Sequence, residues 1–98
     1  MNQKLLHVRF NEIDFSNVDL SGFDLSGSIF LKCNLSNVNF TDAVITNCDL
    51  SSQKPPLILE QVKSTWNYKN NYIRKIDLPA EIQKQLDAEK QTVTRLTV

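Results

Sequence analysis

Apolar positions in the first half of the chain recur every five residues. From Val8 to Ser52 the sequence divides, without an insertion, into nine five-residue phrases: VRFNE, IDFSN, VDLSG, FDLSG, SIFLK, CNLSN, VNFTD, AVITN and CDLSS. The first place of a phrase is apolar in all but the fifth, which begins with Ser28. We predict that first-place and third-place residues share one interior. Its core is then the third-place column, which is large and apolar throughout: Phe10, Phe15, Leu20, Leu25, Phe30, Leu35, Phe40, Ile45 and Leu50.

A period of five fits neither a regular α-helix nor a regular β-strand. Helical faces recur every 3.6 residues and strand faces every two, so neither keeps both apolar places on one side. Asp or Asn fills the second place in six phrases, and Ser or Thr fills the fourth place in seven. Such short polar side chains bond to nearby backbone groups and favour turns. The pattern therefore indicates a chain that turns once per phrase.

These phrases resemble the pentapeptide-repeat family, whose pattern is Ala-(Asp/Asn)-Leu-(Ser/Thr)-X. The resemblance covers 45 of the 98 residues. It implies an all-β fold, a right-handed quadrilateral β-helix in which four phrases form one coil. Residues twenty apart then stack, so that Phe10 lies over Phe30 and Asp14 over Asn34. The segments TWNYK and IDLPAEIQKQLDAEK are similar to a tail that follows the repeats in some other bacterial members.

The repeat is short and has one irregular phrase. Nine phrases make about two coils, on the order of 10 Å tall at the usual strand spacing. So short a stack depends on its caps, because both ends of a solenoid are open. The phrase from Ser28 to Lys32 lacks both usual polar residues, and we expect a local distortion or a covered outer face there, with Ile29, Leu31 and Val44 as exposed apolar residues.

We divide residues 1–98 as one domain in three parts. Residues 1–7 form an N-terminal cap, as an extra strand or as an irregular segment, residues 8–52 the solenoid, and residues 53–98 a helical cap and tail. The consecutive Pro55 and Pro56 are expected to end the solenoid, since proline cannot donate to a ladder.

Two helices are predicted after the solenoid. The first, over residues 57–66, should seal the last coil with an apolar stripe to which Trp66 contributes the largest buried area. Its cap residues are Ile58, Val62 and Trp66. A polar loop should follow over residues 67–74.

The second predicted helix spans about residues 79–91, with Ile82 and Leu86 on a narrow apolar face. This helix either lies against the solenoid or pairs with a copy from another chain, giving a homodimer through the C-terminal helix. Residues 92–98 are expected to be frayed, although Val93, Leu96 and Val98 would extend the contact if ordered.

Charge is uneven along a chain of zero net charge. Residues 10–52 carry six acidic residues against one lysine, a net charge of −5, whereas residues 53–98 carry a net charge of +3. No run of about eighteen apolar residues is present, which predicts no membrane span. The first ten residues do not have the pattern of a signal peptide. We expect a bacterial cytoplasmic protein.

Nothing in the sequence points to catalysis, a cofactor or a metal. The single histidine, His7, has no nearby carboxylate cluster and is interpreted as a surface residue. Cys33 and Cys48 occupy first places, where each acts as a small hydrophobic residue without a disulfide. The chain has only two glycines and no phosphate-binding loop. We predict a protein that is not an enzyme.

Two functions remain as hypotheses. The first is a structural or protein–protein interaction module with an unknown protein partner and no direct nucleic-acid binding. The alternative follows from the resemblance, since some similar proteins are acidic rods that imitate duplex DNA and bind or inhibit a type II topoisomerase, DNA gyrase. The acidic repeats favour this alternative. The expected height argues against it, because about 10 Å spans only about three base pairs.

Overall fold

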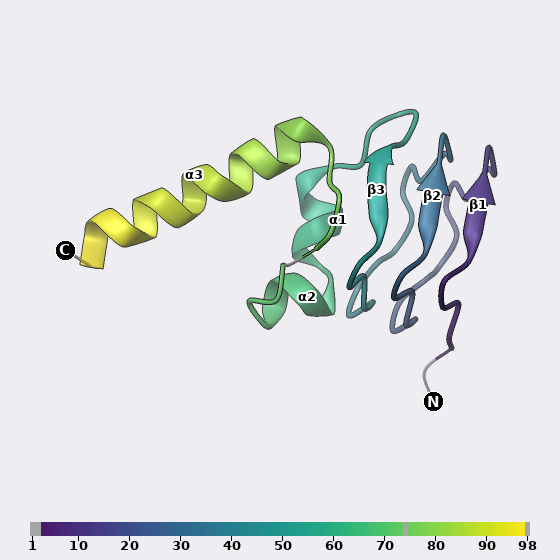
Figure 1. Ribbon diagram of the computed structural model, residues 1–98, viewed down its shortest axis with the longest axis horizontal. Coiled ribbons are helices and arrows are strands. Elements are labelled where there is room, and N and C mark those ends of the chain that lie inside the picture. Colours follow the sequence, from purple (N-terminus) through teal and green to yellow (C-terminus); the bar gives the residue numbers. More distant parts are fainter. Residues whose placement is uncertain (1–2, 74, 98) are drawn as a thin grey trace.

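Three short parallel strands mark one side of a coiled chain in the computed structural model, which describes residues 3–73 and 75–97, with side chains up to residue 89. The strands are β1 (Arg9–Asn11), β2 (Ile29–Leu31) and β3 (Asp49–Ser52). They form one sheet in the order β1-β2-β3 (Figure 1). Phe10 pairs with Phe30, twenty residues on, which is the predicted stacking interval.

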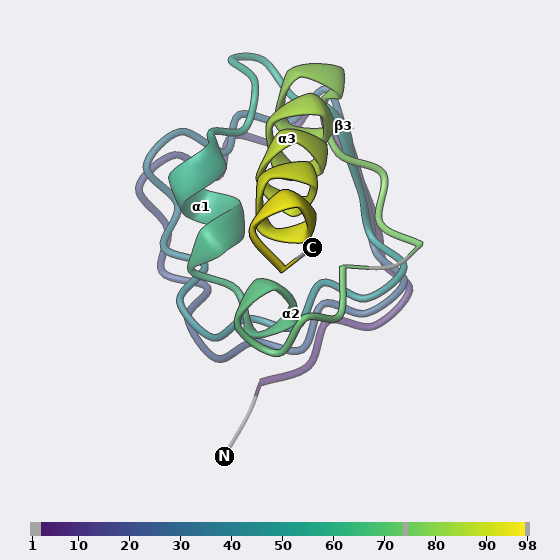
Figure 2. The same cartoon turned by 90° about the vertical axis from the view of Figure 1, so that its left-hand side faces the viewer.

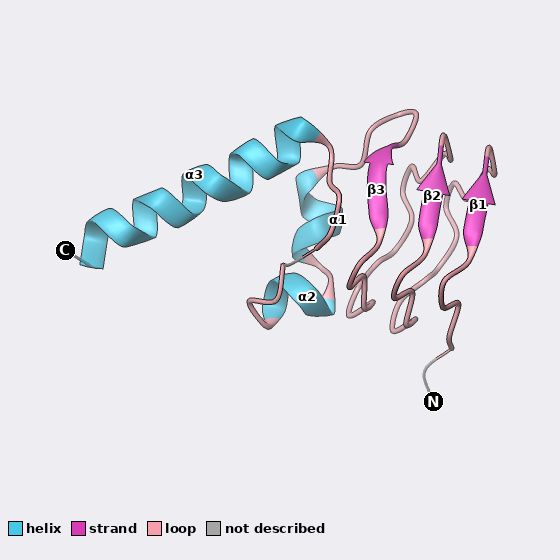
Figure 3. Cartoon of the chain, viewed as in Figure 1, coloured by secondary structure: helices cyan, strands magenta, loops and turns pink. Residues whose placement is uncertain are grey.

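The twenty-residue interval holds around the whole coil. Bridges outside the strands pair Asp14 with Asn34 and Asp19 with Asn39. Backbone hydrogen bonds join the same levels, for example from the Leu20 N–H to the Asn39 carbonyl at 2.9 Å. Successive turns of the chain therefore stack as the layers of a parallel β-solenoid, and Figure 3 shows these layers from the side.

The turns between phrases come from the fifth place. All nine fifth-place residues from His7 to Asn47 have φ between +53° and +76°. This left-handed conformation suits Gly and Asn, and both glycines of the chain occupy it. The second place supports the turn, because each of its six Asp and Asn side chains accepts a hydrogen bond from the backbone N–H two residues later, as Asp14 does from Ser16 at 2.9 Å.

The coil begins before the predicted start. Lys4 bridges Asp24, and the Leu5 N–H donates to the Asp24 carbonyl at 2.9 Å. Residues 3–7 thus form a tenth phrase, with Leu5 in its third place, and extend the coil by one phrase. The described solenoid comprises two full coils, residues 3–22 and 23–42, and half of a third.

The irregular phrase carries a buried serine rather than exposed apolar side chains. Ser28 is fully buried, and its hydroxyl donates to the Leu5 carbonyl and accepts from the Val8 N–H. Ile29, Leu31 and Val44 are half-buried, so the expected exposed spots are not found there. The predicted distortion is present, because the pairing of β2 with β3 shifts its register between Ile29 and Leu31, where Leu31 pairs with Ser52 and β3 has one extra residue.

Helices cover the end of the solenoid beside β3. They are α1 (Leu59–Lys63), α2 (Trp66–Lys69) and α3 (Ala80–Thr97). Figure 2 looks onto this end and shows α1 and α2 over the outline of the coils.

The sequence predicted one helix over residues 57–66 and a loop over 67–74, whereas the structure has two short helices separated at Ser64 and Thr65. α3 continues beyond the predicted end at Gln91, because no glycine or proline interrupts residues 80–97. The side chains of Val93, Leu96 and Val98 lie outside the described residues.

Candidate functional site

The core column is placed as a stack along the solenoid axis. Seven third-place residues, from Leu20 to Leu50, are at most 4% exposed. Phe10 and Phe15, in the first coil, are only half-buried. Their rings pack edge to face with centroids 5.1 Å apart, and Phe10 stacks on Phe30 at 4.9 Å. The core thus thins toward the β1 end because no further coil of the described chain lies over it.

The cap residues differ from the prediction. Val62 is buried, but Ile58 is 55% exposed and Trp66 is 39% exposed. The reason is the break between α1 and α2: the Trp66 N–H donates to the Ala43 carbonyl at 2.9 Å, which fixes the backbone against the coil and turns the indole outward. Leu57 and Thr65 occupy the inward positions instead.

Side-chain amides close the covered end, a role that the sequence pattern does not indicate. The Gln53 amide donates to the Phe30 carbonyl at 2.6 Å, and the Gln61 amide donates to the Leu35 carbonyl at 2.8 Å. Asn67, which is fully buried, accepts from the Ile45 N–H at 2.7 Å and donates to the Thr46 hydroxyl and the Tyr72 carbonyl. These amides bond to backbone groups that would otherwise meet a further coil.

A short extended segment completes the closure. Asp77 bridges Asp49, and the Leu50 N–H donates to the Asp77 carbonyl at 2.7 Å. The flanking Ile76 and Leu78 are buried. This segment leads directly into α3, so the position of α3 is set by the last coil.

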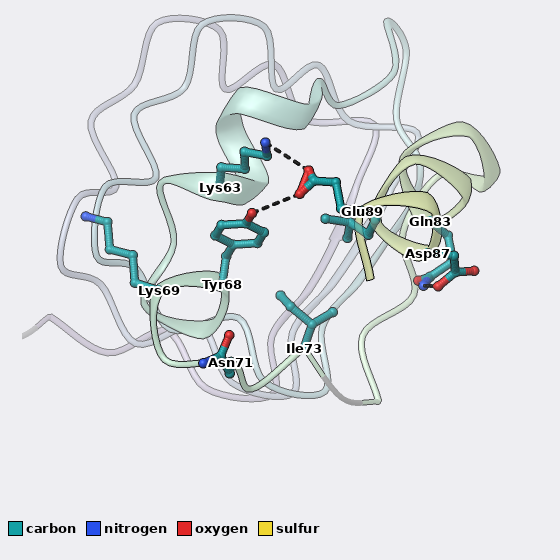
Figure 4. A pocket seen from close by; sticks show the side chains of 9 residues that line it. Lys63, Tyr68, Lys69, Asn71, Ile73, Gln83, Asp87 and Glu89 are labelled. Atoms are coloured by element: carbon teal, nitrogen blue, oxygen red, sulfur yellow. Dashed lines mark hydrogen bonds and ion pairs between the residues drawn. The ribbon is translucent and has the colours of Figure 1, made fainter. Parts of the chain in front are cut away.

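The base of α3 is attached to α1 and α2. Ile82 is buried, Leu86 is half-buried, and the Glu89 carboxylate lies 2.9 Å from the Lys63 ammonium and accepts from the Tyr68 hydroxyl at 3.0 Å (Figure 4). The ion pair with Lys63 lowers the pKa of Glu89 and raises that of Lys63, and the hydrogen bond to Glu89 raises the pKa of Tyr68. An open cavity of about 660 Å³ lies between α3 and these residues.

Chemically reactive groups are held in structural roles. Burial raises the pKa of the Cys48 thiol to about 12, and its sulfur lies 2.9 Å from the Leu25 carbonyl. Cys33 is also buried and free. Within the described residues, no three His, Cys, Asp or Glu side chains are grouped to hold a metal ion. In the same part of the chain, no helix is long and apolar enough to cross a membrane.

The opposite end, beside β1, is apolar and uncovered by the described chain. Ile13 is 43% exposed and Val18 39% exposed, although both occupy inward first places. Leu6, at the start of the coil, is 42% exposed. The molecule therefore has two candidate interaction surfaces, the projecting α3 and the open coil end.

A comparison with known proteins identifies the repeats and nothing else in the chain. A sequence model described as pentapeptide repeats, with eight copies, matches residues 2–30 and 13–51, which together span about half of the chain and include the phrase at residues 3–7. No curated protein and no solved structure matches the chain. With the stacked coils, the turn at every fifth residue and the apolar third-place column in register, the chain belongs to the pentapeptide-repeat family.

Proposed function

We propose that the protein is a non-enzymatic protein–protein interaction module, in which the solenoid is a rigid scaffold and α3 is the element that binds a protein partner. The observation that carries the proposal is the path of α3, which leaves the covered end and extends away from the coils (Figure 1). We infer that the coils are four-sided and right-handed, as the family implies.

The contacts at the base of α3 support this role. Ile82, Leu86 and Glu89, all within the first ten residues of the helix, attach it to the rest of the chain. These attachments set the direction in which the helix leaves the covered end. The ionisable groups nearby, Lys63 and Tyr68, are engaged with Glu89 and serve this attachment rather than a reaction.

A truncation at Glu89 tests the role of α3. Removing residues 90–98 leaves every described attachment in place, so the solenoid should keep its unfolding midpoint, while the circular dichroism loses only the helical signal of residues 90–97. We expect the full chain, used as bait, to retain a saturable protein partner that the truncated chain loses. A partner retained equally by both chains would place binding on the solenoid, and the absence of any saturable partner would refute the module. Light scattering on both chains tests homodimerisation through α3.

Imitation of duplex DNA is a weaker hypothesis than the protein–protein interaction module. It needs carboxylates repeated along the solenoid axis at the spacing of phosphates. Here no acidic column runs along the coils, because Asp14 stacks on Asn34, Asp19 on Asn39 and Asp24 on Val44. Asp49 lies beside another acidic residue, Asp77, but Asp77 belongs to the closing segment and not to the repeats. We expect no effect on the supercoiling activity of DNA gyrase. Inhibition by this protein that is lost on replacing Asp14 and Asp19 with Asn would favour the DNA-mimic function over ours.

A further inference from the structure

The open end of the solenoid presents backbone groups as well as apolar side chains. In the first coil the Ile13 carbonyl accepts from Asn34, and the Phe15 N–H donates to the Asn34 carbonyl. Because alternate residues of an extended chain direct their backbone groups to opposite sides, the N–H and carbonyl of Asp14 between them point away from the second coil. The same holds for Lys4, Arg9 and Asp19, which bridge or pair with the second coil in the same way. An occupant of this end must supply extended backbone.

These four residues also carry a charge pattern. All four occupy second places, all are exposed, and along the coil their charges run positive, positive, negative, negative, in the order Lys4, Arg9, Asp14 and Asp19. We propose that the occupant is a second copy of this chain, bound end to end about a two-fold axis perpendicular to the solenoid. The rotation reverses the direction of the coil, so the facing chains run antiparallel.

One register of this dimer pairs every charge with its opposite. It places Lys4 against Asp19 of the partner subunit and Arg9 against Asp14 of the partner subunit, and the symmetry repeats both pairs. Each of the three other ways of superimposing the four phrases sets like charges against each other. Facing residues in an antiparallel pair are close enough for such charges to stabilise or destabilise it.

The slope of the coil selects the same register. A coil climbs by about one strand spacing, roughly 4.8 Å, over its twenty residues, so the open end is a ramp rather than a flat surface. Pairing Lys4, at the low end of one ramp, with Asp19 of the partner subunit, near the high end of the other, keeps the two chains evenly spaced. Any other register leaves a gap on one side and a clash on the other.

The same register covers the exposed apolar residues. It sets Phe10 against Ile13 of the partner subunit and Leu5 against Val18 of the partner subunit, so each exposed first-place side chain meets a third-place one. The four second-place residues then become pairs that exchange both backbone hydrogen bonds. Charge, slope, backbone and apolar burial thus agree on one arrangement. It uses the end opposite α3 and does not rest on the function proposed for that helix.

Charge reversal tests the dimer. By sedimentation equilibrium, we expect the full chain to reach twice its mass of 11.2 kDa with rising concentration. The pair Lys4→Glu and Arg9→Glu should weaken the dimer at least about tenfold, as should the pair Asp14→Lys and Asp19→Lys. An equimolar mixture of these two variants should associate again, because every facing pair is then opposite in charge. Circular dichroism checks that both variants fold.

Matched controls separate this surface from general effects. Lys32→Glu with Lys54→Glu makes the same change in net charge at exposed positions outside the first coil and should leave the dimer unchanged. Ile13→Asp should abolish it, whereas Ile58→Asp, at an isoleucine that is exposed on the covered end, should not. A chain that stays monomeric at millimolar concentration, a mixture that fails to associate, or a dimer lost in the chain ending at Glu89 would overturn the proposal.

Discussion

Replacing Asn67 with alanine should destabilise the protein more than any other change of a single polar side chain in the covered end. Asn67 is fully buried and makes three hydrogen bonds, one of them with the N–H of Ile45, itself 1% exposed. Without the amide, this N–H has no partner and no access to water, which costs about 1–3 kcal/mol. The lost bonds to Thr46 and Tyr72, both less buried, add about 0.5–1 kcal/mol each.

The sum is a loss of about 2–5 kcal/mol in the free energy of unfolding. For a domain of this size each kcal/mol lowers the melting temperature by about 4–8 °C, so the midpoint should fall by at least about 8 °C. Urea unfolding followed by circular dichroism measures the free energy, and the fluorescence of the single tryptophan, Trp66, next to the substitution reports on the covered end.

Asn70→Ala is the matched control. Asn70 is also an asparagine of the α2 region, but it is exposed, and its side-chain amide donates to the Trp66 carbonyl at 2.8 Å. We expect a loss of less than about 1 kcal/mol, because water replaces that bond. If Asn67→Ala and Asn70→Ala unfold within about 1 kcal/mol of each other, the amide does not close the coil and the reasoning fails.

Three further predictions concern the turns, the base of α3 and the thiols. Gly27→Ala should destabilise more than Gly22→Ala, since both glycines have positive φ but only a Cβ at Gly27 meets the His7 ring; adding His7→Ala should remove the difference in urea unfolding. The lowered pKa of Glu89 contributes stability above its usual value of 4.5, and this is lost as pH falls through the lower folded-state pKa. Glu89→Gln should therefore flatten the acid limb of the stability profile. Ellman's reagent should not react with Cys33 and Cys48 in the native protein and should react with both in urea, whereas fast native reaction would contradict their burial.

The repeat could be read from sequence because its signal is local and redundant. Each phrase carries its own inward residues and its own turn, so the register of Phe10 on Phe30 follows from counting alone. The tenth phrase, Gln3 to His7, carries a weaker signal, since it lacks the Asp or Asn found in the second place of six other phrases and begins with a polar residue. Its place in the coil follows from the bridge of Lys4 to Asp24 and from the backbone bonds of Leu5 to Asp24 and of His7 to Ser26.

The covered end could not be predicted in the same way. A stripe over Ile58, Val62 and Trp66 has helical spacing, but the backbone at Ser64 and Trp66 is bonded to the coil. These bonds shift the inward positions to Leu57 and Thr65. The amides of Gln53, Gln61 and Asn67 resemble any surface amides in the sequence. Their roles depend on contacts more than twenty residues away, for which periodicity carries no signal.

The two ends of this short solenoid pose the same physical problem and differ in how it is met. At either end a coil leaves backbone N–H and carbonyl groups together with half of an apolar core. Beside β3, amide side chains and the segment at Asp77 bond to those groups, and Leu57, Val62 and Ile82 bury the core. Beside β1 no described segment bonds to those backbone groups or covers the apolar core. The second-place charges of the first coil, however, run in an order that is complementary to the same order read in the opposite direction. A closure built from the chain itself at one end and from a second copy at the other accounts for both sets of residues.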